Sequence, residues 1–190
     1  MKSTILEHIQ EHISVIESFD ADMIKTINLI SSLLCDAIKK NNTIFWCGNG
    51  GSASDSQHLA AELVGRFDKN RKSLKSISLS SDSSVLTCIS NDFGYEKVFS
   101  RQIEGLGKNG DVLVGISTSG LSKNVINALL VAKEKKMKTI GFLGKGGGKQ
   151  KKLCDSSIII NSKNTARIQE CHILIGHIIC DLIEKKLLLT

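Results

Sequence analysis

Two short segments rich in glycine and hydroxyl side chains follow apolar runs, and both suit a phosphate ligand. The first is GNGGS over Gly48–Ser52, and the second is STSGLS over Ser117–Ser122. Gly48, Gly50 and Gly51 can adopt positive φ and let a ligand approach the backbone, and a helix that begins there presents free N–H groups to an anion. Five hydroxyl side chains occur in the two segments: Ser52, Ser117, Thr118, Ser119 and Ser122. Helix capping alone would need only one such side chain per helix, so five hydroxyl side chains exceed that need. The pattern therefore predicts phosphate binding, above all at STSGLS.

A histidine and a glutamate after GNGGS have a spacing that could serve a metal. His58 and Glu62 stand four residues apart and share one face of a helix. Gln169 and His177, on the last helical segment, are eight residues apart, which is about 80° around the axis and ~12 Å along it. If the two helices meet, these four side chains form a nitrogen- and oxygen-rich site for Zn²⁺. The spacing alone leaves open an ordinary surface pair of His58 and Glu62.

The remaining three histidines are assigned to solvent or to packing. His8 and His12 fall on the polar side of the first predicted helix, so we expect both to be exposed to solvent. His172 falls among apolar residues of the last helix, so we expect it to pack in the core. None of the three is therefore included in the predicted site.

Two other phosphate-binding motifs fit the glycine-rich turn less well. Gly48-x-Gly50-x-x-Ala53 after a strand also matches a dinucleotide-binding fingerprint. That fingerprint requires an acidic residue about 20 positions further on. Here the nearest acid after the second strand is Asp82, over 30 residues beyond the turn. The dinucleotide match is weak, and a Walker loop is excluded because no GxxxxGK[ST] string occurs.

Alternating helices and strands must position these side chains. Helical periodicity predicts helices over Thr4–Ser18, Asp20–Lys40, Ser52–Gly65, Asp82–Cys88, Tyr95–Leu106, Leu121–Lys136 and Thr165–Leu187. Apolar runs predict strands over Thr43–Cys47, Ser73–Leu79, Asp111–Ser117, Lys138–Gly144 and Ser156–Asn161. Strands that are apolar on both faces and separated by helices imply an α/β fold with a doubly wound, five-stranded parallel sheet. The KGGGKQKK segment, Lys145–Lys152, is expected to be a flexible loop.

Composition limits the classes of partner and compartment. The 190 residues, 41% of them apolar, suit one domain over 1–190 with a substantial core. The net charge of +6 would suit nucleic acid, but aromatic residues are only 4% and none interleaves with the lysine runs, so we favour a solvated surface that attracts a small anion. No apolar run is long enough to span a membrane, and the N-terminus has no signal-peptide pattern, so we expect a cytoplasmic protein. The six cysteines form no CxxC pair and fit buried thiols.

Five strings in a fixed order carry a family resemblance. They are GNGGSASDSQHLAAELVGRF, SNDFGYEKVFSRQ, GISTSGLSKNV, GKGGGKQKKLCD and TARIQECHILIGHIICDLIE. Together they resemble the phosphoheptose isomerases, which have the SIS (sugar isomerase) fold, over essentially the whole chain. The resemblance implies a single SIS domain with two N-terminal helices and a long C-terminal helix, and it implies that residues 1–40 take part in oligomer packing.

The resemblance also implies an activity, a cofactor and a set of site residues. The activity is conversion of sedoheptulose 7-phosphate to D-glycero-D-manno-heptose 7-phosphate, the first step toward nucleotide-activated heptose for lipopolysaccharide or capsule. The assembly is a homotetramer with active sites at subunit interfaces and one Zn²⁺ per subunit. Carried over by motif, the zinc ligands are His58, Glu62, Gln169 and His177. The substrate-binding residues are Asn49, Gly50, Gly51, Glu62, Asn91, Asp92, Ser117, Thr118, Ser119, Ser122 and Gln169, to which we add Ser52 for its place at the helix start.

The residue types account for the chemistry of such an isomerase. A base must take a proton from C1 and an acid must deliver one to C2 through an enediol. Glu62 and His177 are the candidates, and the sequence leaves open which gives and which takes, and whether zinc is catalytic or only positions the sugar. Two other functions stay open: a non-catalytic SIS protein that binds a replication initiator, and a sugar-phosphate sensor without turnover. The presence of all four proposed zinc ligands favours the enzyme.

Overall fold

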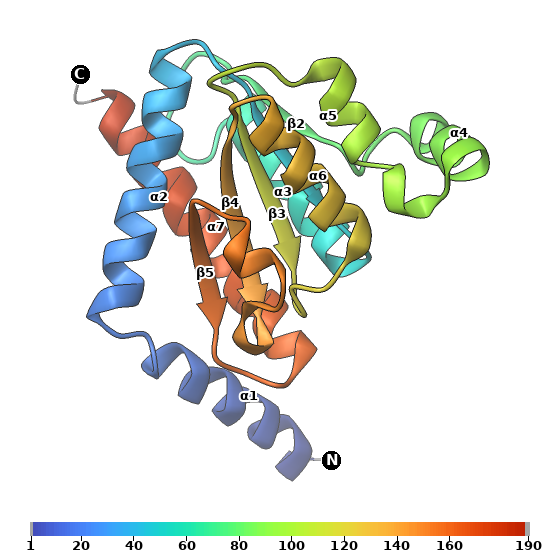
Figure 1. Ribbon diagram of the computed structural model, residues 1–190. Coiled ribbons are helices and arrows are strands. Elements are labelled where there is room, and N and C mark those ends of the chain that lie inside the picture. The colour runs from blue at the N-terminus through green and yellow to red at the C-terminus, as the bar shows by residue number, and fades with distance from the viewer. Residues whose placement is uncertain (1, 189–190) are drawn as a thin grey trace.

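A central five-stranded sheet organises the molecule. The computed structural model describes residues 2–188, and within them the strands run parallel in the order β2-β1-β3-β4-β5 (Figure 1). The strands are β1 Ile44–Gly48, β2 Ser76–Ser78, β3 Val112–Ser117, β4 Lys138–Gly144 and β5 Ser156–Ile160. Every residue of β1 and β3 is buried, as expected for strands that are covered on both faces. The predicted five-stranded parallel sheet is confirmed.

Helices cover both faces of this sheet. The α-helices within the described residues are α1 Lys2–Glu17, α2 Ala21–Lys39, α3 Gly51–Val64, α4 Ser83–Phe93, α5 Ser100–Leu106, α6 Lys123–Glu134 and α7 Thr165–Leu188. Helices α2, α3 and α7 pack on one face around Trp46, and α5 and α6 pack on the other around Phe45 (Figure 1). Trp46 and Phe45 point in opposite directions because side chains alternate along a strand. The doubly wound arrangement and the long last helix are therefore confirmed.

The sheet order places a change of direction between β1 and β3. From β1 the chain continues to β2 on one side, and it then returns to add β3 on the other side of β1. Open parallel sheets bind ligands at such a point, beyond the carboxyl ends of the strands. Gly48, the last residue of β1, pairs with Ile116 of β3. The GNGGS and STSGLS segments therefore start side by side at the same edge of the sheet.

The region between β2 and β3 differs from the sequence prediction. The helix that was expected to end at Cys88 continues to Phe93 as α4. The single helix expected over Tyr95–Leu106 is divided into a 3₁₀ turn, Tyr95–Lys97, and the helix α5. Gly94 separates α4 from this turn with φ 84°, a left-handed conformation that glycine adopts at little cost.

Two further predictions also need correction. The strand expected over Ser73–Leu79 pairs with β1 only along the three residues of β2, at the edge of the sheet. The segment Lys145–Lys152 was expected to be a flexible loop, but it forms two 3₁₀ turns, Lys145–Gly147 and Gln150–Lys152. Gln150 is fully buried, so this segment packs on the rest of the chain and the prediction of a flexible loop was wrong.

The opening helix α1 stands away from the sheet and rests against α7 (Figure 1). Within Lys2–Glu17 only Val15 is buried. The apolar side chains that α1 leaves exposed are those of Ile5, Leu6, Ile9 and Ile13. An apolar stripe of this kind is normally covered by another surface.

Cysteine burial and helix hydropathy complete the description. All six cysteines are free, and four of them are buried: Cys35, Cys47, Cys171 and Cys180. Cys154 is partly buried and Cys88 is exposed. Among residues 2–188, no helix combines the length and apolar character that crossing a bilayer requires.

Candidate active site

The two predicted phosphate segments are tied together by side-chain amides. Asn49 Nδ2 donates to Asn124 Oδ1 at 2.9 Å, and Asn124 Nδ2 donates to Asn49 Oδ1 at 2.8 Å. The Tyr95 hydroxyl donates to the same Asn49 oxygen at 2.8 Å. Asn124 lies in the first turn of α6 and is buried, so water competes little for this pair. The pair joins the turn before α3 to the start of α6.

The turn before α3 needs glycine for two separate reasons. Gly50 has φ 55°, which is costly for residues that carry a Cβ. A Cβ on Gly48 would lie 2.5 Å from the carbonyl oxygen of Ser52, because strand and helix approach closely. Ser52, which is predicted to be a substrate contact, is buried at the helix start.

Hydroxyl groups organise the STSGLS segment. Ser117 Oγ lies 3.1 Å from Ser122 Oγ and accepts the Gly120 N–H at 3.1 Å. The Ser119 hydroxyl accepts the N–H of Leu121 at 3.2 Å. Ser117 is buried, whereas Thr118 and Ser119 are partly exposed. The segment therefore has a hydrogen-bonded inner part and hydroxyl groups that reach the surface.

The lysine-rich segment packs directly on STSGLS. Gly120 has φ 63°, and a Cβ on it would overlap the carbonyl oxygen of Gly147. The Gln150 N–H donates to the Gly120 carbonyl at 3.1 Å. Gly146 and Gly147 have positive φ, which lets the chain turn tightly against the neighbouring segment. This contact explains why the segment is not the flexible loop that its composition predicted.

Helices α3 and α7 run parallel on one face of the sheet and touch along their length. A Cβ on Gly51, at the start of α3, would lie 2.5 Å from Gln169 Nε2 in α7. A Cβ on Gly176 would lie 2.5 Å from a methyl group of Leu59. The sequence left open whether these two helices meet. They do so within a single chain.

His58, Glu62 and His177 form one group on these two helices. One ligand atom from each lies within 4.8 Å of the others. His58 Nε2 is 2.9 Å from Glu62 Oε1 and 3.3 Å from His177 Nε2. Ligands bound tetrahedrally to zinc at about 2.0–2.1 Å are about 3.3 Å apart, so the two distances from His58 are near this value, and imidazole and carboxylate are donor types that zinc accepts. The His58 side chain is 49% exposed and that of Glu62 21%, so the group is open to solvent.

Gln169 is placed at the other end of the helix pair. Its amide lies against Gly51, and Gly51 precedes His58 by seven residues of α3, which is ~10 Å along the helix. Three of the four side chains predicted as zinc ligands are thus brought together in one chain. Gln169 stands between this group and the glycine-rich turn.

Two neighbours of the group were not singled out from the sequence. The Phe67 ring lies 5.5 Å from the His177 ring, centroid to centroid. Asp55 precedes His58 by one turn of α3, a spacing that could have drawn attention to it. Burial raises the pKa of Asp55 to about 6, although nearby His58 acts in the opposite direction. The group thus has an aromatic neighbour and a second carboxyl.

Asn91 and Asp92 lie in the last turn of α4, shortly before Tyr95. Both are exposed, and Asn91 Nδ2 donates to Asp92 Oδ1 at 2.8 Å. Figure 1 shows α4 projecting from one side of the molecule, far from α1. The segment that contains Asn91 and Asp92 is linked to the glycine-rich turn through the hydrogen bond from the Tyr95 hydroxyl to Asn49.

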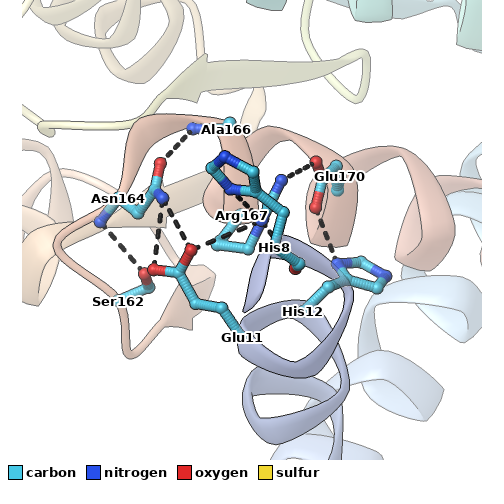
Figure 2. Close-up of polar contacts among 8 residues, drawn as sticks. All are labelled: His8, Glu11, His12, Ser162, Asn164, Ala166, Arg167 and Glu170. Carbon is cyan, nitrogen blue, oxygen red and sulfur yellow. Dashed lines mark hydrogen bonds and ion pairs between the residues drawn. The ribbon is translucent and has the colours of Figure 1, made fainter. Parts of the chain in front are cut away.

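A second polar cluster joins α1 to the start of α7 (Figure 2). Arg167 donates to the His8 carbonyl at 2.8 Å and forms ion pairs with Glu11 and Glu170. His12 Nδ1 lies 2.7 Å from a Glu170 carboxylate oxygen. His8 is exposed, as expected, but His12 is partly buried because the polar side of α1 turns toward α7. This cluster holds α1 and is separate from the His58 group.

Comparison by sequence identifies relatives of known name. The SIS domain family model matches residues 7–144. A phosphoheptose isomerase of a Nitratiruptor species is 53% identical over 185 residues, which cover 95% of this chain and 99% of the relative. Phosphoheptose isomerase 1 of Campylobacter jejuni is 51% identical, with coverage of 93% of this chain and 94% of the relative.

Comparison by structure gives the same result. The structure of a phosphoheptose isomerase from Neisseria gonorrhoeae has a TM-score of 0.92 and 39% identity, covering 97% of this chain and 98% of its own. A phosphoheptose isomerase from Francisella tularensis also has a TM-score of 0.92, at 30% identity, covering 96% and 97%. Sequence and fold agree over nearly the whole chain. The chain therefore belongs to the SIS domain family and, within it, to the phosphoheptose isomerases.

Proposed function

We propose that this chain converts sedoheptulose 7-phosphate to D-glycero-D-manno-heptose 7-phosphate. Its relatives at about half identity are named phosphoheptose isomerases and align over almost the full chain. The observation that carries the proposal is the group of His58, Glu62 and His177 on the parallel helices α3 and α7. It places a carboxylate and two imidazoles together on α7 and on α3, the helix that begins at the GNGGS segment.

The substrate phosphate is assigned to the STSGLS segment. Partly exposed hydroxyls of Thr118 and Ser119 stand before the N-terminus of α6, where an anion is favoured. The packed lysine-rich segment adds positive charge beside this segment. The proposed substrate contacts are Asn49, Gly50, Gly51, Ser52, Glu62, Asn91, Asp92, Ser117, Thr118, Ser119, Ser122 and Gln169.

One Zn²⁺ per subunit is part of the proposal. The proposed ligands are the three grouped side chains of His58, Glu62 and His177. Gln169, whose amide lies nearer the glycine-rich turn, is kept as the fourth ligand on the family resemblance alone. The distances from His58 to the other two members of the group support this assignment. Bound zinc would stabilise negative charge on the oxygens of an enediol. Nitrogen and oxygen donors of this kind are the ones that zinc accepts in proteins.

Glu62 and His177 are assigned the proton transfers. The reaction moves the carbonyl from C2 to C1, so one proton leaves C1 and another reaches C2. A carboxylate and an imidazole can both exchange protons near neutral pH. His58 lies within 3.3 Å of each of them, which keeps the two groups close enough to act on neighbouring carbons. The order in which they act is left unassigned.

The chain is proposed to form a homotetramer with active sites at subunit interfaces. Two features support this assembly: the exposed apolar stripe of α1 and the open side of the His58 group. In this arrangement the helices of residues 1–40 supply packing surface. The protein is further proposed to act in the cytoplasm, where its product would lead to heptose for lipopolysaccharide or capsule.

An NMR assay with sedoheptulose 7-phosphate tests the reaction directly. Purified protein supplied with Zn²⁺ should produce an aldose signal, and Glu62→Gln should lower turnover by about 100-fold or more. Glu104→Gln, an exposed carboxylate on α5, is the matched control and should leave turnover unchanged. No aldose from the unaltered protein would exclude the isomerase and leave a sensing function. Near-normal turnover of Glu62→Gln would remove Glu62 from the proton transfers.

A further inference from the structure

A buried carboxylate near the end of α7 holds the segment that follows α3. Glu184 is 1% exposed, and its oxygens accept the N–H groups of Phe67, Asp68 and Lys69 at 2.8–3.0 Å. The Arg71 Nε–H donates to Glu184 at 2.9 Å. Burial acts to raise the pKa of Glu184, but the three backbone N–H groups and Arg71 outweigh it and lower this pKa. Glu184 is therefore a charged and fully hydrogen-bonded anchor.

Arg71 extends this anchor to the end of α3. Its side chain is 5% exposed. One terminal nitrogen donates to the Glu62 carbonyl at 2.7 Å, and the other donates to the Leu63 carbonyl at 2.9 Å and the Gly65 carbonyl at 3.3 Å. Carbonyl groups in the last turn of a helix have no partner within the helix, so Arg71 supplies them. The ion pair of Arg71 and Glu184 thus ties the last turn of α3 to α7.

The anchored segment reaches the His58 group at two points. The backbone of Glu62 is held by Arg71, as described above. Phe67, whose N–H binds Glu184, places its ring 5.5 Å from the His177 ring. The His177 ring also lies 4.8 Å from the His58 ring, centroid to centroid, so it stands beside both the Phe67 ring and the His58 ring. Arg71 and Glu184 act on the group through Glu62 and Phe67.

We propose that Glu184 and Arg71 are positioning residues that hold Glu62 and His177 in the geometry required to bind the metal. The inference rests on the zinc site of the proposed function. The competing explanation is a purely structural ion pair, which would change the stability of the fold and nothing else. The two explanations differ in a measurable way, because residues that support metal ligands alter metal affinity in the folded protein.

The test compares Zn²⁺ affinity of the metal-free protein by competition with a chromophoric chelator. Glu184→Gln keeps the size of the side chain but turns an acceptor into an N–H donor that faces backbone N–H groups. We expect Zn²⁺ binding about 10–100-fold weaker. Asp111→Asn is the matched control, because Asp111 is also 1% exposed and accepts backbone N–H groups of Thr43 and Lys108 at the amino edge of the sheet. It should lose stability and keep its Zn²⁺ affinity.

A second variant keeps the test decisive if Glu184→Gln does not fold. Phe67→Ala leaves the ion pair in place and removes the ring beside His177, so Zn²⁺ affinity should also fall. All affinities are measured at a temperature where circular dichroism shows a folded protein. If Glu184→Gln folds and binds Zn²⁺ with normal affinity, the inference is contradicted and the zinc site stands. If only Phe67→Ala folds, normal Zn²⁺ affinity in that variant has the same meaning. An equal loss in Asp111→Asn contradicts it as well. An unaltered protein that binds no Zn²⁺ rules out the zinc site and the inference together.

Discussion

Two sides of α7 each carry a histidine, and the surroundings of the two rings differ. His172 faces the sheet, where it is fully buried and donates from Nε2 to the Leu143 carbonyl at 3.1 Å. His177 stands five residues further on, which is about 140° around the helix. It faces α3, where its Nε2 lies 3.3 Å from that of His58. One residue type on one helix thus serves packing on one side and a polar group on the other.

Access to water and polar partners accounts for this difference. Burial lowers the pKa of His172 to about 4, and the hydrogen bond to the Leu143 carbonyl opposes this only in part. His172 is therefore uncharged at neutral pH and serves as a shaped, singly hydrogen-bonded core residue. His177 is partly exposed beside a carboxylate and a second imidazole, so it can exchange protons or bind a ligand. The environment of each ring, and not the helix that carries it, decides its chemistry.

The largest expected effect is on turnover, and it comes from replacing His177, the histidine of α7 that faces α3. His177→Ala removes a proposed proton-transfer group and metal ligand, so turnover should fall by about 100-fold or more. His172→Gln is the matched variant on the sheet side, because glutamine keeps a donor for the Leu143 carbonyl. Its folded fraction should keep normal turnover in the NMR assay. Near-normal turnover of His177→Ala would remove the functional contrast between the two sides of α7.

The pH dependence of the free energy of unfolding should reveal His172, the buried histidine on the side of α7 that faces the sheet. The unfolded chain protonates His172 near pH 6.5, whereas the folded protein does so only near pH 4. Between these values the unfolded state binds more protons, so the free energy of unfolding should fall as the pH is lowered, by about 2 kcal/mol from pH 6.5 to pH 5. Urea unfolding at several pH values measures this change in the free energy of unfolding.

The same experiment on His172→Gln isolates this contribution. Asp55 acts in the opposite direction, because its raised pKa of about 6 means that the folded state binds the extra proton as the pH falls. The difference between the unaltered protein and His172→Gln cancels the Asp55 contribution. Identical pH profiles for the two proteins would show that His172 does not remain neutral in the core.

Contacts within one element were predictable from the sequence, and contacts between elements were not. The pairing of His58 with Glu62 follows from their spacing on one helix. The contact of His58 with His177 depends on how closely α3 approaches α7, and this is set by Gly176 against Leu59. A glycine within an apolar helical pattern does not reveal which neighbour it admits.

The same limit explains the other corrections. The five strands were predictable because buried parallel strands are continuous apolar runs. The lysine-rich segment looks like a loop by composition, and only its contact with Gly120 shows why it is packed. Glu184 stands near the chain end among lysines, a position typical of solvent-exposed residues. Its burial becomes visible only once the segment after α3 is placed beside it.

The smallest expected effect tests the contact between α3 and α7 itself. Gly176→Ala adds a methyl group 2.5 Å from a methyl of Leu59, whose side chain is fully buried. Overpacking costs about 1–3 kcal/mol, and alanine regains about 1 kcal/mol of helix propensity. We expect a net loss of about 1 kcal/mol in the free energy of unfolding, measured with urea. Gly51→Ala is the control, because its new methyl group would meet the flexible end of Gln169. A Gly176→Ala protein as stable as the unaltered one would mean that α3 and α7 are not in tight contact, and His177 would lose the neighbours that distinguish it from His172.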